Sequence, residues 1–531
     1  MSTSGTVPSL LSLKKKKPPP KMMTKVERIV TKKPIPPPVQ APPRQLKPAA
    51  KPANGLGRKE ATPRRSHTPA SSRPSSKEPV ERIKQERSRP NKRASPTVST
   101  PQFTSDDEDE KEEAQPRKRA RVEQVIDPNR RIRDSDAFTG TGVDLDRVHA
   151  CEIANSNLEE HNRSQYVPFF TALMEGEREE PDVYLQYPGA AANPEKYQLV
   201  RPVDSSDFRP ITEIFETMKV VSEYYLDDAS AERVFCEEDG SGLYQKLKRP
   251  LIHAERGKVG AQTSFIEIIE EYNRLIVAKR ADGTIATTID SMQNIPLSLI
   301  NHIIKNQIYS RTVSPSVHLV RQYEGFSDNV YGELLPMFLS KIFKETKLRS
   351  DQIFVDLGSG VGNCVLQAAL ETGCEAWGCE MMDNPAKLAD LQAQEFPARC
   401  KLWGLKPGPI HLIHADFLQN DQIREVLKQA DVILINNQAF TAELNDKLKN
   451  YFLDLKEGAQ IVSLKYYRDP LHRIKESNQY DPVNVLKVKE MERFSGMVSW
   501  TDDPGKWYLQ TKDTKELRDF ESRTKLNGHR L

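Results

Sequence analysis

Short apolar runs alternate with longer helical stretches in the C-terminal part of the chain, and this alternation constrains the fold most strongly. The apolar runs are 353–356, 375–380, 410–416, 431–436 and 459–465. Consecutive strands joined by helices make right-handed crossovers, which produce a parallel sheet with helices on both faces. Two further extended runs, 483–491 and 506–511, could close the sheet as an antiparallel pair. The sequence therefore predicts a doubly wound α/β domain over residues 319–515.

A glycine-rich turn, "VDLGSGVGN" at 355–363, follows the first of these strands. In doubly wound sheets, ligands bind beyond the carboxyl ends of the strands, where the strand order reverses. Dehydrogenases carry G-x-G-x-x-G at this turn, whereas here Asp356 precedes Gly358, Gly360 and Gly362. A carboxylate would repel a diphosphate but would hold an ammonium group, and S-adenosylmethionine has an amino-acid group, a sulfonium and no phosphate. The turn favours S-adenosylmethionine over a dinucleotide, and the alternative role for Asp356 alone is to cap the next helix.

Acidic residues at the ends of the next two strands also favour an adenosyl ligand. Glu380 ends the second strand, where a carboxylate can accept hydrogen bonds from two ribose hydroxyls. Asp416 and Phe417 follow the third strand and offer an acceptor for the adenine amino group and a ring for its face. Taken alone, Phe417 would more commonly pack in the core. Because these residues occur in order at successive strand ends, they predict one cofactor crevice.

The fourth strand ends in "INNQAF" at 435–440, which places two amide side chains beside the predicted crevice. An amide carbonyl can orient an attacking nitrogen next to a sulfonium methyl group. Asn436 and Asn437 are therefore candidates for binding an amino substrate. The alternative for either one is a simple turn after a strand.

Together, "YEGFSDNVYGELLP" (323–336), the glycine turn, "GCE" (378–380), "DF" (416–417) and "NNQAF" resemble the disruptor-of-telomeric-silencing family of histone-lysine methyltransferases. This family lacks a SET domain, and the resemblance covers residues 140–515. It implies a class I S-adenosylmethionine-dependent methyltransferase with a Rossmann-like sheet that methylates a lysine in the folded core of histone H3 within nucleosomes. It also implies a nuclear chromatin regulator with roles in telomeric silencing and the DNA-damage checkpoint. The long basic N-terminal arm is of the fungal type.

The resemblance further implies a role for individual residues. The implied cofactor-binding residues are Tyr331, Gly332, Glu333, Leu334, Phe354, Val355, Asp356, Leu357, Gly358, Ser359, Gly360, Val361, Gly362, Asn363, Glu380, Asp416 and Phe417. Those implied for the lysine channel and catalysis are Glu324, Tyr331, Asn436, Asn437, Phe440 and Trp500. Asp356 and Asn363 would hold the amino and carboxylate groups of the cofactor, and Leu334 would act through its backbone. Trp500 lies far from the other motifs, and its alternative is packing; Glu324 and Glu333 are candidate bases, but no general base is assigned.

Charge divides the chain into a basic arm and an acidic body. Residues 1–100 contain 24 Lys and Arg against 5 Asp and Glu, whereas the remainder contains 54 against 70. The same first 100 residues hold 18 of the 38 prolines, so they cannot bury enough apolar surface to offset chain entropy. We expect residues 1–135 to be a disordered arm, with "PRKRAR" (116–121) as a nuclear-import or nucleic-acid-binding cluster. The arm would bind nucleosomal DNA through phosphates, and the acidic body would face basic histone surface.

The remaining segments carry fewer signals. Residues 140–318 predict a mainly helical lobe. Its expected helices span 209–228, 265–280 and 296–310, and its extended segments lie within 181–203. A further helix is expected from Glu333 to Lys344, and residues 516–531 are expected to be a tail. The six cysteines show no zinc-binding spacing and predict buried, reduced thiols in an intracellular protein without a metal. No run predicts a signal peptide or a membrane span.

Two other functions remain open from the sequence. A methyltransferase acting on exocyclic nitrogens of DNA or RNA bases would share the fold, but such enzymes usually carry a Pro-Pro-aromatic motif where this chain has "NNQAF". A flipped base would also need a wider pocket. A non-enzymatic chromatin-binding module with an inactive cofactor fold is the second alternative, and the intact acids and glycines argue against it.

Overall fold

The computed structural model describes residues 127–139, 146–155, 166–179, 181–189, 194–205, 207–238, 240–320 and 332–528. All of them belong to one unit, Asn91–Leu531. Most of the predicted basic arm (1–126) and the predicted site residues Glu324 and Tyr331 lie outside the described residues.

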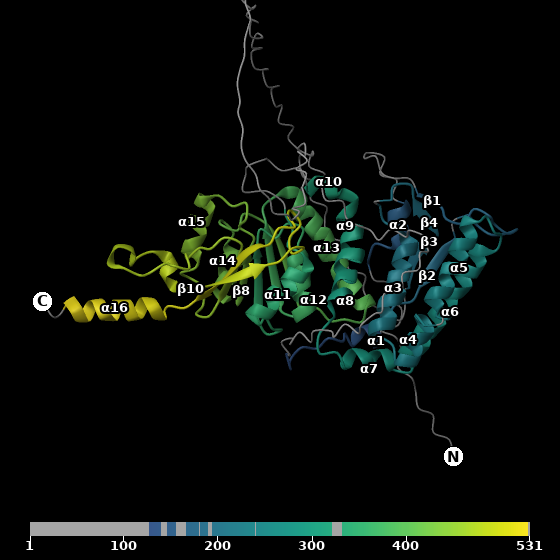
Figure 1. Ribbon diagram of the computed structural model, residues 1–531, viewed down its shortest axis with the longest axis horizontal. Helices are drawn as coiled ribbons and strands as arrows, with labels where there is room; N and C mark the ends of the chain where they lie inside the picture. Colours follow the sequence, from purple (N-terminus) through teal and green to yellow (C-terminus); the bar gives the residue numbers. More distant parts are fainter. Residues whose placement is uncertain are drawn as a thin grey trace, which may run out of the picture. The chain divides into compact units, whose positions relative to one another are not determined.

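The described residues up to 320 form a mainly helical lobe with short antiparallel strand pairs β1–β4 and β2–β3 (Figure 1). Its elements are α1 (Asp136–Thr139), α2 (Ala150–Asn155), β1 (Tyr166–Pro168), β2 (Asp182–Leu185), β3 (Glu195–Gln198), β4 (Val200–Pro202), α3 (Pro210–Tyr224), α4 (Asp228–Val234), α5 (Leu243–Glu255), α6 (Ala261–Ala281), α7 (Thr284–Asp290), α8 (Leu297–Asn301), η1 (His302–Tyr309), α9 (Ser310–Thr312), η2 (Ser314–Ser316) and α10 (Val317–Val320). The expected helices correspond to α3, α6 and α8 continued by η1, and the expected extended segments correspond to β2, β3 and β4. In α6 the buried residues Phe265, Ile269, Tyr272 and Ile276 recur at helical spacing, so one face of the helix enters the core.

Within the described chain, the C-terminal part builds a seven-stranded sheet with the order β10-β11-β9-β8-β5-β6-β7. The strands are β5 (Ile353–Leu357), β6 (Glu375–Glu380), β7 (Ile410–His414), β8 (Val432–Ile435), β9 (Gln460–Ser463), β10 (Leu486–Arg493) and β11 (Gly505–Lys512). β5 to β9 run parallel, whereas β11 is antiparallel to both β9 and β10. The strand order reverses at β5, which has β6 on one side and β8 on the other. The predicted doubly wound α/β fold is confirmed, and so is the expected antiparallel pair.

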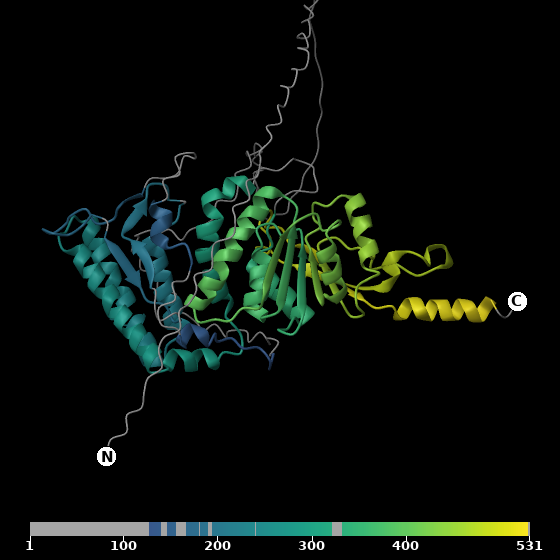
Figure 2. The ribbon, with the colours of Figure 1, turned by 180° about the vertical axis from the view of Figure 1, so that it is seen from behind.

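Helices cover both faces of this sheet (Figures 1 and 2). They are α11 (Pro336–Thr346), α12 (Asn363–Thr372), α13 (Asp383–Leu402), α14 (Asp421–Gln429) and α15 (Ala442–Tyr451), followed by η3 (Glu476–Asn478), η4 (Pro482–Val485) and α16 (Lys515–Gly528). Successive strand residues point to opposite faces, so Phe354 belongs to a core shared with α11, α12, α13 and the helical lobe. Val355 and Leu357 belong to a second core, which also contains buried residues of α14 and α15.

Three segments differ from the sequence-based expectation. The helix expected from Glu333 begins at Pro336, because a residue before proline is driven out of the helical region and Leu335 has φ −83° and ψ 153°. Part of the expected tail is helix α16. Within the segment expected to be a disordered arm, Asp127 accepts hydrogen bonds from the backbone amide and the hydroxyl of Ser350. The expected boundaries at 135–140, 318–319 and 515–516 stay predictions.

A buried cluster of charges joins the helical lobe to α13. Glu195 of β3 accepts from Arg147 at 3.0 Å, Arg311 at 3.1 Å and Arg399 at 3.0 Å, and these four side chains are fully buried. Arg311 also binds Glu213 of α3 at 2.8 Å. Because buried charges are stable only when they are paired and hydrogen-bonded, this cluster fixes β3, α3 and α13 against one another.

All six cysteines are unpaired, and Cys364 is the least buried of them. In the described parts of the chain, every helix is too short or too polar to cross a bilayer.

Candidate active site

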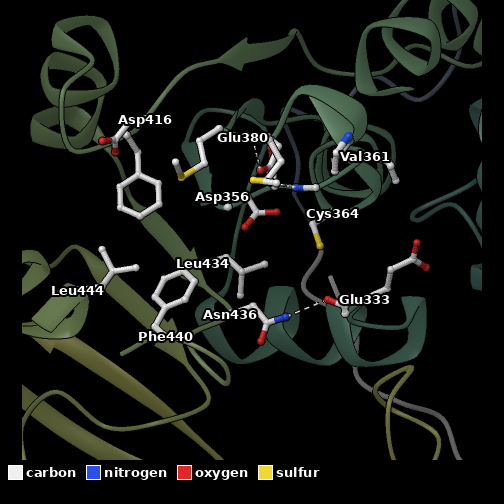
Figure 3. A pocket seen from close by; sticks show the side chains of 18 of the residues that line it. Glu333, Asp356, Val361, Cys364, Glu380, Asp416, Leu434, Asn436, Phe440 and Leu444 are labelled. Atoms are coloured by element: carbon white, nitrogen blue, oxygen red, sulfur yellow. Dashed lines mark hydrogen bonds between the residues drawn. The ribbon is translucent and has the colours of Figure 1, made fainter. Parts of the chain in front are cut away.

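A cavity of about 680 Å³ opens at the carboxyl ends of β5, β6 and β8, where the strand order reverses. This volume is within the usual range for a small-molecule site. Its lining residues are Val320, Gly332, Glu333, Leu334, Asp356, Gly358, Ser359, Gly360, Val361, Asn363, Cys364, Glu380, Met381, Met382, Asp383, Asn384, Pro385, Asp416, Phe417, Leu418, Leu434, Asn436, Phe440, Thr441, Glu443, Leu444 and Lys447. Figure 3 shows Asp416 and Leu444 toward one end, Glu333 toward the other, and Asp356 and Asn436 between them.

The glycine turn uses backbone conformations that favour glycine. Gly358, Gly360 and Gly362 have φ values of 85°, 56° and 91°, which residues with a side chain rarely adopt. The amides of Gly358 and Ser359 both donate to the Cys379 carbonyl, at 2.9 and 3.1 Å, so the turn is tied to the end of β6. It leads directly into α12, whose N-terminal amides favour an anionic group nearby.

Asp356 is a buried carboxyl group at the floor of the cavity, with only 3% of its surface exposed. Burial raises its pKa to about 7, a hydrogen bond from the Cys364 thiol lowers it, and the charge of Glu380 raises it. The carboxyl therefore titrates near neutral pH. A ligand ammonium group would hold it in the ionised form.

Glu380, the last residue of β6, is held by the backbone on each of its two oxygens. One oxygen accepts from the amide of Gly360 at 2.9 Å and the other from the amide of Met382 at 2.8 Å. Each carboxylate oxygen has a second lone pair. Glu380 can therefore accept two further hydrogen bonds from a pair of neighbouring hydroxyls, as a ribose provides.

The end of the cavity at Asp416 and Leu444, away from Glu333, can accept a flat apolar group. The rings of Phe417 and Phe440 face each other at an interplanar angle of 28°, with centroids 6.4 Å apart, and Leu444 of α15 lines the same end. Asp416 accepts from the Leu418 amide and the Gln419 side chain, both at 2.8 Å, so it also closes the turn after β7. Phe417 both belongs to the second core and lines the cavity.

Asn436 brings an amide into the middle of the cavity. Its Nδ2 donates to the Gly332 carbonyl at 3.0 Å, which fixes the orientation of the amide. Its Oδ1 is buried and has no hydrogen-bond partner among the described residues. A buried acceptor without a partner is costly, and an amine donor in the cavity would satisfy it.

Asn437 differs from Asn436, and its predicted catalytic role stays a prediction. Its side chain is fully buried and is absent from the cavity lining. Oδ1 accepts from the amides of Leu464 and Lys465, and Nδ2 donates to the Lys465 carbonyl and to Asn445. Asn437 therefore ties the end of β8 to the end of β9, which is the turn role that the sequence left open.

Residues 332–335 form a strap that pairs with residues 497–500. The Glu333 amide donates to Ser499 Oγ at 2.9 Å, and the Ser499 amide donates to the Glu333 carbonyl at 2.9 Å. A Cβ atom built on Gly332 would lie 2.7 Å from the ring of Trp500. Trp500 packs against the strap and does not line the cavity, so its place in a lysine channel stays a prediction.

The structure brings together most of the predicted residues but not all of them. Phe354, Val355 and Leu357 are buried in the two cores and are not among the residues that line the cavity, so their predicted contacts with the cofactor stay predictions. Gly362 shapes the turn without lining the cavity.

Several lining residues were missed by the sequence analysis. Leu434 could have been found, because it lies two residues before Asn436 on the same face of β8 and pairs with Asp356. Cys364, Met381 and Leu444 carry no distinctive sequence signal.

Comparisons with known proteins relate the chain to histone methyltransferases. A family model described as "Histone methylation protein DOT1" matches residues 309–512. A protein of Aspergillus fumigatus named "Histone-lysine N-methyltransferase, H3 lysine-79 specific" is 44% identical over 478 residues, which cover 86% of this chain and 92% of that protein. A protein of the same name from Emericella nidulans is 45% identical over 406 residues, covering 76% of this chain and 77% of that protein. A solved RNA methyltransferase from Salinibacter ruber, in complex with S-adenosyl-L-homocysteine, is 16% identical, covers 34% of this chain and 95% of that chain, and has a TM-score of 0.23.

Proposed function

The chain belongs to the DOT1 family of histone methylation proteins, and we propose that it transfers a methyl group from S-adenosylmethionine to the side-chain nitrogen of a lysine in histone H3. The relatives are named as specific for H3 lysine-79, and we propose the same lysine here. One observation of the site carries the proposal. Asn436 offers a buried acceptor without a partner in the same cavity as the acid-flanked glycine turn.

The residues of the cavity fit S-adenosylmethionine along its whole length. Asp356 would hold the ammonium group, Asn363 and the amides of the turn the carboxylate, and Glu380 the ribose hydroxyls. Asp416 and Phe417 would hold the adenine. When bound, this cofactor supplies a methyl group made electrophilic by its sulfonium. Among the described residues that line the cavity, Lys447 is the single basic one. This lining agrees with a ligand that has no phosphate.

The remaining task of the site is to present a neutral amine. A lysine with a pKa near 10.4 loses its proton at neutral pH at a cost of about 4–5 kcal/mol. Burial in the cavity and a neighbouring positive charge both lower that pKa. Asn436 Oδ1 accepts a hydrogen bond from the amine and directs its lone pair, while Phe440 and Leu434 exclude water. The proton leaves to solvent, and the described residues contribute mainly position and orientation.

The test measures methyl transfer from radiolabelled S-adenosylmethionine to nucleosomes, free histone H3 and naked DNA. We expect nucleosomal H3 to be labelled, and Asn436→Ala to lower kcat by about 100-fold, because a positioned polar group of this kind contributes that much. Asn450→Ala, an exposed asparagine on α15, is the matched control and should retain full activity. Labelling of naked DNA with unlabelled H3 would instead establish a base methyltransferase.

A second variant separates the enzyme from a non-enzymatic chromatin module. Gly358→Arg places a large side chain at a residue with φ 85° that lines the cavity, so it should abolish methylation. If cells that carry this variant retained the full function of the gene, the module would be the better description.

We further propose that the basic arm binds nucleosomal DNA and that the protein acts in the nucleus. The first 100 residues contain 24 basic and 5 acidic side chains, and this positive charge supports binding to DNA. Contacts with phosphates give affinity that depends steeply on salt. A truncation should remove residues 1–125 and keep Asp127, which contacts Ser350. We expect the truncated protein to methylate nucleosomes more weakly and with a shallower salt dependence. Unchanged activity and unchanged salt dependence would refute the role of the arm.

A further inference from the structure

Gln392 of α13 is a fully buried side chain that contacts the glycine turn from behind. Its Nε2 donates to the Val361 carbonyl at 2.5 Å and to Asn363 Oδ1 at 3.0 Å. Val361 and Asn363 both line the cavity, whereas Gln392 itself does not. Gln392 therefore contacts two residues that line the cavity and can affect a ligand through them.

The bond to Asn363 decides which end of that amide is available to a ligand. An asparagine side chain has one acceptor end and one donor end. Because Oδ1 is engaged by Gln392, the Nδ2 end is the one left for the cavity. A donor at this place, beside the N-terminal amides of α12, suits a carboxylate and disfavours an ammonium group.

The unsatisfied oxygen of Gln392 shows that the direction of this bond matters. Gln392 Oε1 is buried without a hydrogen-bond partner among the described residues. Turning the amide over would direct this oxygen at two other oxygens, the Val361 carbonyl and Asn363 Oδ1. The protein thus tolerates one buried unsatisfied acceptor, a cost that native structures rarely accept without a reason, and keeps the donor end on the turn.

We propose that Gln392 is a positioning residue that selects the amino-acid carboxylate of the cofactor by fixing the donor end of Asn363. The inference rests on the proposed function, because it presumes an adenosyl ligand with an amino-acid group. The proposed role belongs to a residue outside the cavity, and it concerns the carboxylate of the cofactor and no other group of it.

The experiment compares two probes that differ in that group. S-adenosylhomocysteine has the amino-acid group, whereas 5′-methylthioadenosine lacks it and keeps the adenosine. Gln392→Met conserves volume but removes both donor bonds, so Asn363 can turn and present Oδ1. By calorimetry we expect the Kd of S-adenosylhomocysteine to rise about 10-fold, as for the loss of one hydrogen bond to a charged group. The Kd of 5′-methylthioadenosine should change less than 2-fold.

Further variants test the route through Asn363. Asn363→Ala should weaken S-adenosylhomocysteine by a similar factor, and the double variant should lose little more, because the two residues act as one unit. Gln394→Met, an exposed glutamine on the same helix, is the matched control and should bind both probes as the unmodified protein does. In turnover, Gln392→Met should raise KM for S-adenosylmethionine about 10-fold with kcat nearly unchanged.

The outcomes separate this inference from the proposed function. If the unmodified protein bound neither probe, the proposed function would be wrong. If it bound both, and Gln392→Met weakened both equally or neither, the role of Gln392 would be overturned. Should Gln392→Met melt at a much lower temperature, the calorimetry is repeated below its melting transition, where the ratio of the two Kd values is still measured on folded protein and should shift in the same direction.

Discussion

Asp356 combines a role in ligand binding with a cost to the free protein. Asp356 is buried, with 3% of its surface exposed, and burial raises the pKa of its carboxyl group from 3.8 to about 7. A group whose folded pKa is raised favours folding while it is protonated, and this contribution is lost as the pH rises from about 4 through about 7. At pH 8 the free protein therefore holds a buried charge that a ligand ammonium would neutralise.

Asp356→Asn should make the free protein more stable at alkaline pH while removing cofactor binding. We expect the free energy of unfolding to rise on the order of 3 kcal/mol at pH 8, and this gain to shrink as the pH is lowered toward 5. Urea denaturation at a series of pH values measures both. Affinity for S-adenosylhomocysteine should fall at least 10-fold, because the ammonium loses its counter-charge.

Asp390→Asn is the control for this prediction, since Asp390 is exposed on α13 and should change stability by less than about 0.5 kcal/mol at any pH. A destabilised Asp356→Asn variant at pH 8 would show that the carboxylate is already neutralised in the free protein.

The neighbours Asn436 and Asn437 show what the sequence can and cannot resolve about single residues. Both were candidates, because both follow the fourth strand. Only the backbone at the strand end determines that Asn436 lines the cavity and that Asn437 binds β9. The same limit applies to Phe354, Val355 and Leu357, which share a motif with Asp356 but belong to the buried cores. The motifs predicted which strand ends would surround a cavity, and the direction of each side chain required the structure.

The strap at 332–335 was not visible in the sequence because its partners lie more than 160 residues away. Its apolar residues predicted the start of a helix, whereas Leu334 forms an isolated bridge with Val498 and the helix begins at Pro336. Local periodicity did predict α3, α6 and the parallel strands, because the spacing of apolar residues within each of these segments determines which face is buried. The π-helix η1 was expected only as ordinary helix, since the change from i→i+4 to i→i+5 hydrogen bonds leaves no local signal.

Gly332→Ala tests whether the strap must lie close against Trp500. The added Cβ would fall 2.7 Å from the indole ring, so the strap must move and take the Gly332 carbonyl away from Asn436 Nδ2. We expect kcat to fall at least 10-fold, because displacement of a positioning contact by about 1 Å has effects of this size or more.

A second substitution, which replaces Trp500, is the control for Gly332→Ala. Trp500→Phe combined with Gly332→Ala gives the Cβ more room and should recover part of the lost turnover. If Gly332→Ala alone retained full activity, the packing of the strap on Trp500 would have no role in catalysis. Single-turnover measurements on nucleosomes distinguish these outcomes.

The helical lobe and the sheet depend on each other through the buried charges around Glu195. The pKa of Glu195 would be raised by burial alone, but the charges of Arg399 and Arg311 hold it well below its usual range. Its contribution to stability is therefore present above pH 4 or so and is lost as the pH falls. The same core that contains Phe354 of β5 also contains residues of α3 and α6. The lobe thus completes one face of the methyltransferase sheet.

Glu195→Gln should destabilise the whole molecule and not the lobe alone. The amide cannot neutralise Arg147, Arg311 and Arg399, which remain fully buried, and breaking a buried charge cluster in this way costs about 3–5 kcal/mol. Asp182→Asn on β2 is the matched control: it removes the partly exposed ion pair with Lys196 at 3.0 Å, which should cost less than about 1 kcal/mol. Urea denaturation can be followed by tryptophan fluorescence, because Trp403 and Trp507 both lie in the core that the lobe and the sheet share. We expect a single transition, and we expect its midpoint to move to a lower urea concentration for Glu195→Gln. Two separated transitions in the variant would mean that the sheet keeps its fold without the lobe.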